Sequence, residues 1–201
     1  MSKYSEDIES LQQYMRSIQK YETLSFEDEQ ALAYRWVNDK DRRAVHKLVN
    51  AHLRLVVKVA LGFRGYGLPL GELIQEGNIG LMQAVVRFDP DKGFRLSTYA
   101  MWWIKASMQE YILHSWSMVK IGTTAAQKKL FFNLRKMRAK LKEMNDDNLS
   151  EESIEYIAKK LGVKPEEVIS MDQRLMGNDQ SLNAMISSEV GSEWMYWLED
   201  E

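Results

Sequence analysis

The chain has 201 residues, no cysteine and a formal net charge of −2, with 45% apolar and 28% charged residues. This length supports one large or two small domains with a real core, and the lack of cysteine excludes disulfides and thiolate metal sites. No run approaches the roughly 18 apolar residues of a transmembrane helix, and the polar N-terminus lacks the apolar core of a signal peptide. We therefore expect a cytoplasmic protein without membrane contact.

The small net charge hides a strong asymmetry along the sequence. Residues 1–91 carry a net charge of −1, residues 92–142 carry +10 with Glu110 as their one anion, and residues 143–201 carry −11. A basic centre of this strength predicts a polyanionic partner. The acidic end could fold back on that centre, mimic nucleic acid or enter another basic channel.

The first half of the sequence has helical periodicity almost throughout. Its predicted helices cover residues 7–20, 25–38, 41–63 and 71–88. Ser25 can cap the second of them, with Asp28 at the position that completes a capping box. His52 falls on the apolar stripe of the third, where we expect a satisfied core histidine. The fourth helix offers these candidates for burial: Leu73, Ile74, Leu81 and Val85.

The second half continues the helical pattern, with helices predicted over residues 97–116, 124–142, 150–161 and 165–176. Ser97 is a plausible N-cap for the first of them, Thr123 or Thr124 for the second, and Ser150 for the third. From Gly177 onward no period remains, and we expect an extended or disordered segment. Together the two halves predict an all-α, multi-helix protein.

The helix over residues 97–116 begins in a run rich in aromatic residues, with basic residues among them. Tyr99, Trp102 and Trp103 are spaced so that their rings can meet. Neighbouring helix positions are about 100° apart, so both tryptophans cannot sit at the centre of one buried stripe, and at least one ring should reach the surface. Such a cluster is commonly core packing, but beside basic side chains it also suits the stacking of unpaired bases. The net charge of the surrounding residues favours the second interpretation.

Signatures of catalysis are missing from the sequence. His46, His52 and His114 lie far apart, and there is no zinc-binding His-Glu-x-x-His, no phosphate-cradling loop and no Gly-x-Ser-x-Gly. We expect no enzymatic activity, no cofactor and no metal. The last two predicted helices resemble a helix-turn-helix in outline, but they contain only three cations, so a packing module is the expected role.

Several long motifs, in order, resemble the bacterial sigma-70 family. They include Ala-His-Leu-Arg-Leu-Val-Val-Lys from residue 51, Leu-Ile-Gln-Glu-Gly-Asn-Ile-Gly from residue 73 and the run over residues 94–105. Residues 127–135, Gln-Lys-Lys-Leu-Phe-Phe-Asn-Leu-Arg, are similar to the stretch that marks heat-shock sigma factors of the RpoH type. The resemblance covers about residues 45–142. It implies a factor that binds core RNA polymerase and directs transcription initiation at stress-response promoters, under chaperone or protease regulators.

The resemblance also implies roles for individual residues. Those that would dock on polymerase, at the β′ coiled coil or the β subunit, are Glu72, Gln75, Glu76, Asn78, Met82, Lys129, Phe131 and Arg135. Those that would bind promoter DNA, as flipped non-template bases or as duplex, are Phe94, Arg95, Tyr99, Trp102, Trp103, Lys105, Ala106, Gln109, Lys120, Thr124, Gln127 and Lys128. Ala106 departs from the glutamine of the housekeeping type, which favours an alternative promoter set.

The same resemblance implies three parts. Residues 1–120 would form the region 1.2/2 domain that docks on polymerase and melts the minus-ten element, residues 121–177 a three-helix region 3 domain, and residues 178–201 an acidic linker, or sigma finger. The sequence ends where the family continues into a minus-35-binding domain, so we expect a truncated form. Two other interpretations stay open: a helical polymerase-binding adaptor that does not read DNA, and a generic single-strand-binding protein.

Overall fold

The computed structural model describes residues 2–120, 122, 124–141, 149–177, 179, 181–185 and 193–197, with the backbone alone for residues 2–8, 176 and 197. The chain divides into two compact units, residues 1–116 and 117–201, and each is described by itself. The described residues are mostly helical, and their only β-structure is one isolated bridge between Met185 and Glu193. The predicted all-α class is therefore confirmed.

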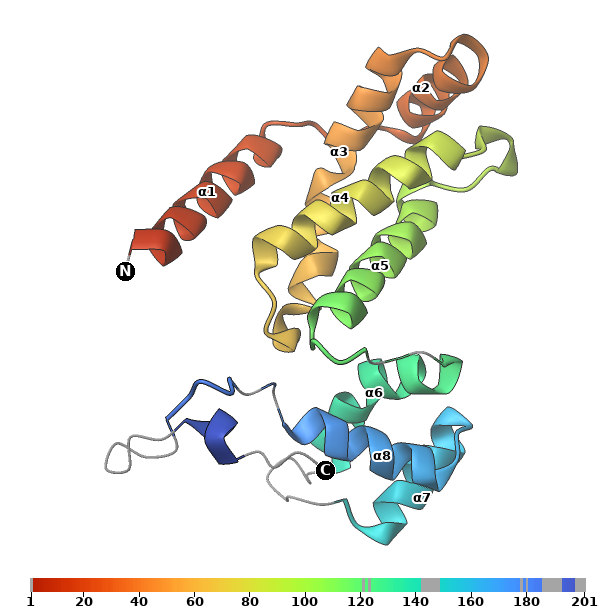
Figure 1. Ribbon diagram of the computed structural model, residues 1–201. Coiled ribbons are helices and arrows are strands. Elements are labelled where there is room, and N and C mark those ends of the chain that lie inside the picture. The colour runs from red at the N-terminus through yellow and green to blue at the C-terminus, as the bar shows by residue number, and fades with distance from the viewer. Residues whose placement is uncertain are drawn as a thin grey trace. The chain divides into compact units, whose positions relative to one another are not determined.

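The first unit contains five helices, of which three form its centre. They are α1 (Ser2–Gln19), α2 (Phe26–Asp39), α3 (Arg42–Leu61), α4 (Leu70–Arg87) and α5 (Leu96–Ser115), with short 3-10 turns η1 (Arg64–Tyr66) and η2 (Pro90–Lys92). Helices α3, α4 and α5 lie side by side, and α2 packs on α3 (Figure 1). Ser25 caps α2 as predicted, because its hydroxyl oxygen accepts from the Asp28 amide at 3.1 Å.

The core of this unit follows from apolar residues repeated along two helices. On α5 every fourth residue is fully buried: Leu96, Ala100, Ile104, Met108 and Ile112. The four α4 residues predicted to be buried are buried as well. Gly77 and Gly80 let the two helices approach closely, since a Cβ on Gly80 would lie 2.7 Å from the carbonyl oxygen of Trp103.

The start of α5 corrects one sequence prediction. The helix begins at Leu96, with Arg95 rather than Ser97 as the N-cap residue, and the Arg95 side chain makes no capping bond. The Leu96 amide instead donates to Oε1 of Glu29, on α2, at 2.8 Å. A carboxylate distant in sequence thus satisfies one of the orphan amides of the helix N-terminus, and the local pattern alone did not reveal it.

The second unit is built on three helices and a short turn: α6 (Ala125–Leu141), α7 (Glu151–Leu161), α8 (Pro165–Met176) and η3 (Trp194–Trp197). Thr124 and Gln127 cap α6 reciprocally, each side chain accepting from the other's amide, so the Thr124 alternative is confirmed. Ser150 caps α7 as predicted. An ion pair of 2.8 Å between Arg138 and Asp172 joins α6 to α8. Residue 123 and the predicted break over 145–148 lie outside the described residues.

The segment after α8 is not simply extended. Around the Met185–Glu193 bridge, the amides of Trp194 and Met195 donate to the carbonyls of Ala184 and Leu182. Asp179 accepts from the hydroxyl of Ser117 and the amide of Met118 in the same unit. The acidic residues of this segment that lie outside the described part are Glu189, Glu199, Asp200 and Glu201. Among the helices described, none is long and apolar enough to cross a lipid bilayer.

The close approach of α4 and α5 yields a test with a matched control on one helix. Gly80→Ala forces a Cβ against the Trp103 backbone, which cannot yield as a flexible side chain could. We expect the free energy of unfolding to fall by about 1–3 kcal/mol, the usual cost of overpacking. Gly71→Ala, also on α4, meets nothing within 4 Å and should be neutral or stabilising by up to about 1 kcal/mol. Urea unfolding followed by circular dichroism measures both, and equal effects would contradict this packing argument.

Candidate nucleic-acid interface

A pocket of about 280 Å³ opens where α4 ends and α5 begins. Its lining combines aromatic rings with charged and hydroxyl side chains: Arg87, Phe88, Asp89, Lys92, Phe94, Thr98, Tyr99 and Trp102. The structure thus brings together three of the predicted DNA-binding residues, Phe94, Tyr99 and Trp102. The volume lies just below the range typical of ligand pockets, which begins at about 300 Å³. A pocket of this size and lining suits one planar, polar-edged ring.

The two adjacent tryptophans have different environments, as helical geometry predicted. The Trp102 side chain is 76% exposed at the pocket. Trp103 is half-buried, with the Tyr99 ring 6.2 Å away in an edge contact and the Arg87 guanidinium 4.6 Å above its face. Trp103 therefore packs against the Tyr99 ring. The exposed ring of Trp102 is available for stacking.

Sequence reasoning missed five residues of the pocket: Arg87, Phe88, Asp89, Lys92 and Thr98. Lys92 lies 3.7 Å from the Asp89 carboxylate, so a cation and an anion are both presented at the same opening. Their sequence signal was weak, because Asp89 and Lys92 belong to an ordinary proline-glycine turn. Only the folding of that turn beside α5 places these side chains around one cavity.

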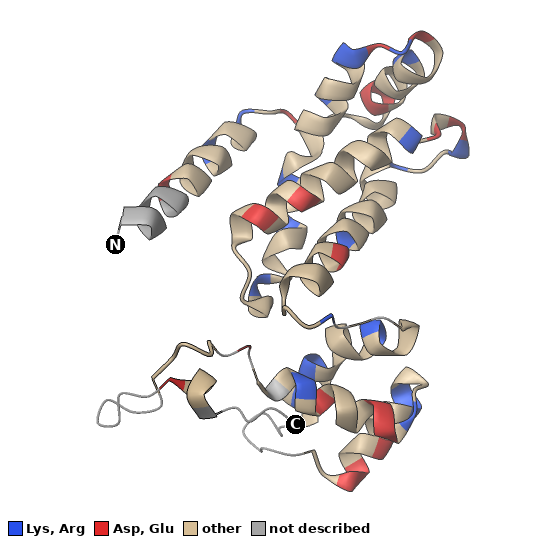
Figure 2. Cartoon of the chain, in the orientation of Figure 1, with Lys and Arg blue, Asp and Glu red and all other residues tan. Residues whose placement is uncertain are grey.

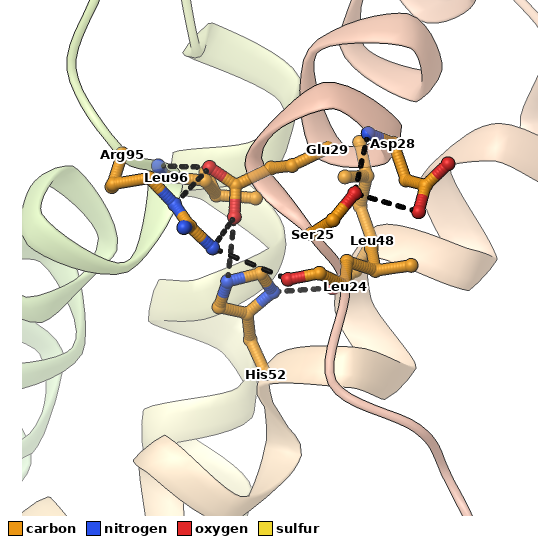
Figure 3. Close-up of polar contacts among 8 residues, drawn as sticks. All are labelled: Leu24, Ser25, Asp28, Glu29, Leu48, His52, Arg95 and Leu96. Atoms are coloured by element: carbon orange, nitrogen blue, oxygen red, sulfur yellow. Dashed lines mark hydrogen bonds and ion pairs between the residues drawn. The ribbon is translucent and has the colours of Figure 1, made fainter.

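Arg95, which was predicted to contact the melted strand, pairs with a carboxylate within the first unit. Its Nε and Nη2 donate to the two carboxylate oxygens of Glu29 at 3.1 and 3.2 Å, and Nη2 also donates to the Leu24 carbonyl at 3.3 Å (Figure 3). Arg95 does not line the pocket. In this structure the Arg95 guanidinium is hydrogen-bonded to the buried carboxylate of Glu29. We therefore expect Arg95 to affect DNA binding indirectly, through the position of that carboxylate.

Glu29 has a fully buried side chain and gathers donors from three directions. Besides Arg95 and the Leu96 amide, Nε2 of His52 lies 3.4 Å from Oε2 (Figure 3). Nδ1 of His52 lies 2.8 Å from the Leu48 carbonyl oxygen, so each ring nitrogen faces an acceptor. Burial by itself raises the pKa of the Glu29 carboxyl, but hydrogen bonds from His52, Leu96 and Arg95 outweigh it and hold that pKa below its ordinary value of 4.5. His52 is thus a satisfied core histidine, as predicted.

The residues predicted to read duplex DNA follow Trp102 along one side of α5. Lys105 and Ala106 are exposed and Gln109 is half-buried, on the side away from the buried row through Ile104 and Met108. One helix side therefore continues from the pocket as a polar strip with a single small residue at Ala106. Such a strip can lie against the edge of a duplex, while the pocket takes an unpaired base.

The predicted polymerase-docking residues of the first unit share α4, but not all are equally accessible. Glu72 and Gln75 are exposed, Met82 is 46% exposed, and Glu76 and Asn78 are half-buried. The two carboxylates are the red bands on α4 in Figure 2. Exposed Ile79 and Val86, which sequence reasoning did not select, extend the same helix as apolar neighbours. The face is therefore acidic at one end and apolar at the other.

Two of these docking residues have partners within the unit. The Tyr111 hydroxyl donates to the Glu72 carboxylate, and burial together with this hydrogen bond raises the pKa of Tyr111. Asn78 donates through Nδ2 to the Tyr14 hydroxyl at 3.2 Å. Glu72 and Asn78 are consequently oriented by contacts with other helices rather than free to rotate.

The remaining predicted residues lie in the second unit. Lys120 and Lys128 are exposed, whereas Thr124 and Gln127 cap α6 and so are already bonded to each other. Cations recur along α6, visible as blue bands in Figure 2. This helix therefore offers phosphate-binding charge.

Two residues predicted to touch polymerase make contacts within the second unit. Phe131 is 1% exposed, in edge contact with Phe132 at 5.1 Å, so it is a core side chain; its apolar ring is stabilised by burial and cannot offer a surface. Lys129 donates through Nζ to the Leu161 carbonyl at the end of α7. Arg135 is exposed on α6. Within the described chain no group of three or more metal-ligating side chains is found.

Comparison with known proteins gives the class of this chain. Residues 48–117 match the family model described as Sigma-70 region 2, which spans α4, α5 and the pocket between them. The chain therefore belongs to the sigma-70 family.

Curated relatives with high identity are named as RNA polymerase sigma factors. The chain is 58% identical, over 95% of its length and 65% of the relative's, to RNA polymerase sigma factor RpoH of Caulobacter vibrioides. It is 55% identical, over 95% of the chain and 64% of the relative, to RNA polymerase sigma factor RpoH of Rhizobium radiobacter. It is 47% identical, over 96% of the chain and 65% of the relative, to RNA polymerase sigma-C factor of Myxococcus xanthus. The chain spans about 65% of the length of the curated relatives it matches.

The buried carboxylate gives a pH-dependent prediction. Because the pKa of Glu29 is lowered in the folded chain, its ionised form stabilises the fold at neutral pH, and that contribution is lost as pH falls below about 4.5. Glu29→Gln should therefore lower the free energy of unfolding at neutral pH by roughly 1–3 kcal/mol, as expected when buried donors lose a charged partner. The gap between the two proteins should narrow in acid. Urea unfolding at several pH values measures it, and a pH-independent gap would contradict this assignment.

Proposed function

We propose that this chain acts as a sigma factor of the heat-shock type, which binds core RNA polymerase and directs initiation by holding unpaired minus-ten bases. The observation that carries the proposal is the pocket beside α5, with Tyr99 and Trp102 in its wall. The relationship to sigma factors named RpoH supports it. Control by a chaperone or protease, implied by the family resemblance, rests on that resemblance alone.

The proposed mechanism is a balance of stacking energies. Removing a base from the duplex costs a few kcal/mol of free energy. Stacking on an aromatic side chain stabilises the flipped base by about 1–3 kcal/mol. Trp102 supplies the open face, and Tyr99 is held edge-on by Trp103. No covalent bond forms, so no catalytic group is required.

The polar rim of the pocket indicates which base it favours. The Asp89 carboxylate can accept from an exocyclic amino group, as carboxylates do when they read bases. Lys92 and Arg87 supply positive charge for a neighbouring phosphate. We therefore expect a base with an exocyclic amine, such as adenine, to enter the pocket.

Different parts of the chain would have different roles. Residues 1–120 would dock on polymerase through α4 and read the minus-ten element, and residues 121–177 would add the basic face of α6 to the DNA just upstream. Residues 178–201 would form an acidic linker in the polymerase cleft. An adaptor that binds polymerase without reading DNA is the alternative, and it has no use for an exposed tryptophan beside a base-sized pocket.

The stacking role predicts the effect of one substitution. With core RNA polymerase present, Trp102→Ala should weaken binding of a labelled non-template minus-ten strand by about 5–150-fold, the equivalent of about 1–3 kcal/mol. Tyr156→Ala, at a 49% exposed tyrosine of the second unit, should leave binding unchanged. Fluorescence anisotropy measures both, beside a scrambled strand. Equal binding of the two strands, or no effect of Trp102→Ala, would favour the adaptor.

The docking role predicts a separate loss. Met82→Lys puts a charge in the half-exposed apolar part of the α4 face and should weaken binding to core RNA polymerase by about 30-fold or more, as at an interface hot spot. Met118→Lys makes the same change at a 95% exposed position of the second unit and serves as the matched control. Titration of labelled chain with core polymerase measures the affinity. Equal affinities for the two variants would remove α4 from the proposed interface.

A further inference from the structure

The connection between α4 and α5 carries most of the pocket. Residues 86–96, here called the pocket segment, include five of its lining residues: Arg87, Phe88, Asp89, Lys92 and Phe94. Between the end of α4 at Arg87 and the start of α5 at Leu96, the segment contains only the short turn η2, and Gly93 takes the left-handed conformation, with φ of 70°. This part of the segment has little structure of its own to hold the other four side chains around a cavity, so its shape depends on neighbouring elements.

Helix α2 holds the two ends of the pocket segment. At one end, the indole Nε1 of Trp36 donates to the carbonyl oxygen of Val86 at 3.2 Å. At the other end, Glu29 accepts from the side chain of Arg95 and from the amide of Leu96, the first residue of α5. The second anchor is buried and charge-assisted, which makes it the stronger of the two.

A third contact holds the middle of the segment. The Tyr34 hydroxyl donates to Oδ1 of Asp91 at 2.7 Å, which raises the pKa of Tyr34. The Asp91 amide in turn donates to the side chain of Asp89, a pocket residue, at 3.1 Å. The chain of contacts therefore runs from α2 through η2 to a carboxylate of the pocket. None of the three α2 residues lines the pocket itself.

We propose that α2 positions the pocket: Glu29, with Tyr34 and Trp36, holds residues 86–96 in the shape that accepts a base, without touching the base. His52 supports this role from α3, because its ring orients the Glu29 carboxylate. The proposal rests on the proposed function for the nature of the ligand. It adds that selectivity for the minus-ten strand depends on a helix outside the matched family region, residues 48–117.

The first test needs no DNA. Hydrogen exchange is followed in the full chain for wild type, Glu29→Gln, Tyr34→Phe and Arg35→Gln. Arg35 is the matched control, because it lies on α2 but pairs with Asp41 at 2.6 Å. We expect amides of residues 88–99 to exchange roughly tenfold faster, relative to residues 73–85, in Glu29→Gln, less so in Tyr34→Phe, and unchanged in Arg35→Gln. Peptides from residues 73–85 report global unfolding, so they should speed up only as far as the lower free energy of unfolding of Glu29→Gln requires, and stay unchanged in Tyr34→Phe and Arg35→Gln.

Two exchange results would overturn the proposal. One is unchanged exchange over residues 88–99 in Glu29→Gln and Tyr34→Phe. The other is an even increase across α3, α4 and α5 with no additional increase over residues 88–99, which would limit the role of Glu29 to general stability. Tyr34→Phe removes only the hydroxyl of a partly exposed ring, so it keeps the test decisive even where Glu29→Gln folds poorly.

The second test measures anisotropy with core RNA polymerase, a labelled minus-ten strand and a scrambled strand. We expect Glu29→Gln and Tyr34→Phe to reduce the preference for the minus-ten strand about tenfold, as a small misplacement of binding groups does, and Arg35→Gln to retain it. Faster exchange with an unchanged preference would overturn the positioning role and leave the proposed function standing. If the wild type itself shows no preference, the proposed function fails, and the exchange result alone decides whether α2 holds the segment.

Discussion

The close contact of α4 with α5 is the constraint on which the first unit depends. Gly80 lets the backbones of α4 and α5 approach each other beside Trp103. The Ser107 hydroxyl of α5 donates to the Glu76 carbonyl of α4 at 2.8 Å and so links the two helices. This contact fixes the rotation of α5, so that every fourth residue from Leu96 is buried. Trp102 lies about 200° from Ala100 on the helix and must therefore face outward. The exposed indole is a consequence of helix packing, not of a local feature of the sequence around it.

One buried carboxylate joins α2 and α3 to α5, whose first residue, Leu96, lies 67 residues further along the chain. Glu29 would be costly to bury alone, because a charge out of water needs partners. Arg95, His52 and the Leu96 amide supply them. A buried charge pair of this kind can specify a unique arrangement as well as affect stability. The position of Glu29 agrees with such a role, because Glu29 pairs with Arg95 and with the first amide of α5 and so determines where α5 begins.

The sequence predicted what depends on periodicity and missed what depends on distant partners. The helices, the Ser25 cap and the buried row through Leu73 and Leu81 follow from local patterns and are confirmed. The cap of α5 was wrong, because its acceptor, Glu29, lies 67 residues away. Phe131 was assigned to polymerase docking by resemblance, and the structure shows it 1% exposed, which the sequence pattern of α6 did not predict. The pocket could not be predicted either, because its turn residues line a cavity only when the turn folds beside α5.

The two proposed sites of the first unit share one rigid element. Helix α4 carries the docking face along its length and ends at Arg87, which enters the pocket wall and covers Trp103. Its other contacts are with buried apolar rows of α3 and α5, which resist deformation because packed cores transmit displacement instead of absorbing it. A partner that displaces α4 therefore also displaces the pocket, unless the segment after α4 changes its conformation. The anchors from α2 restrain that segment, so the docking face and the pocket are expected to move as one body.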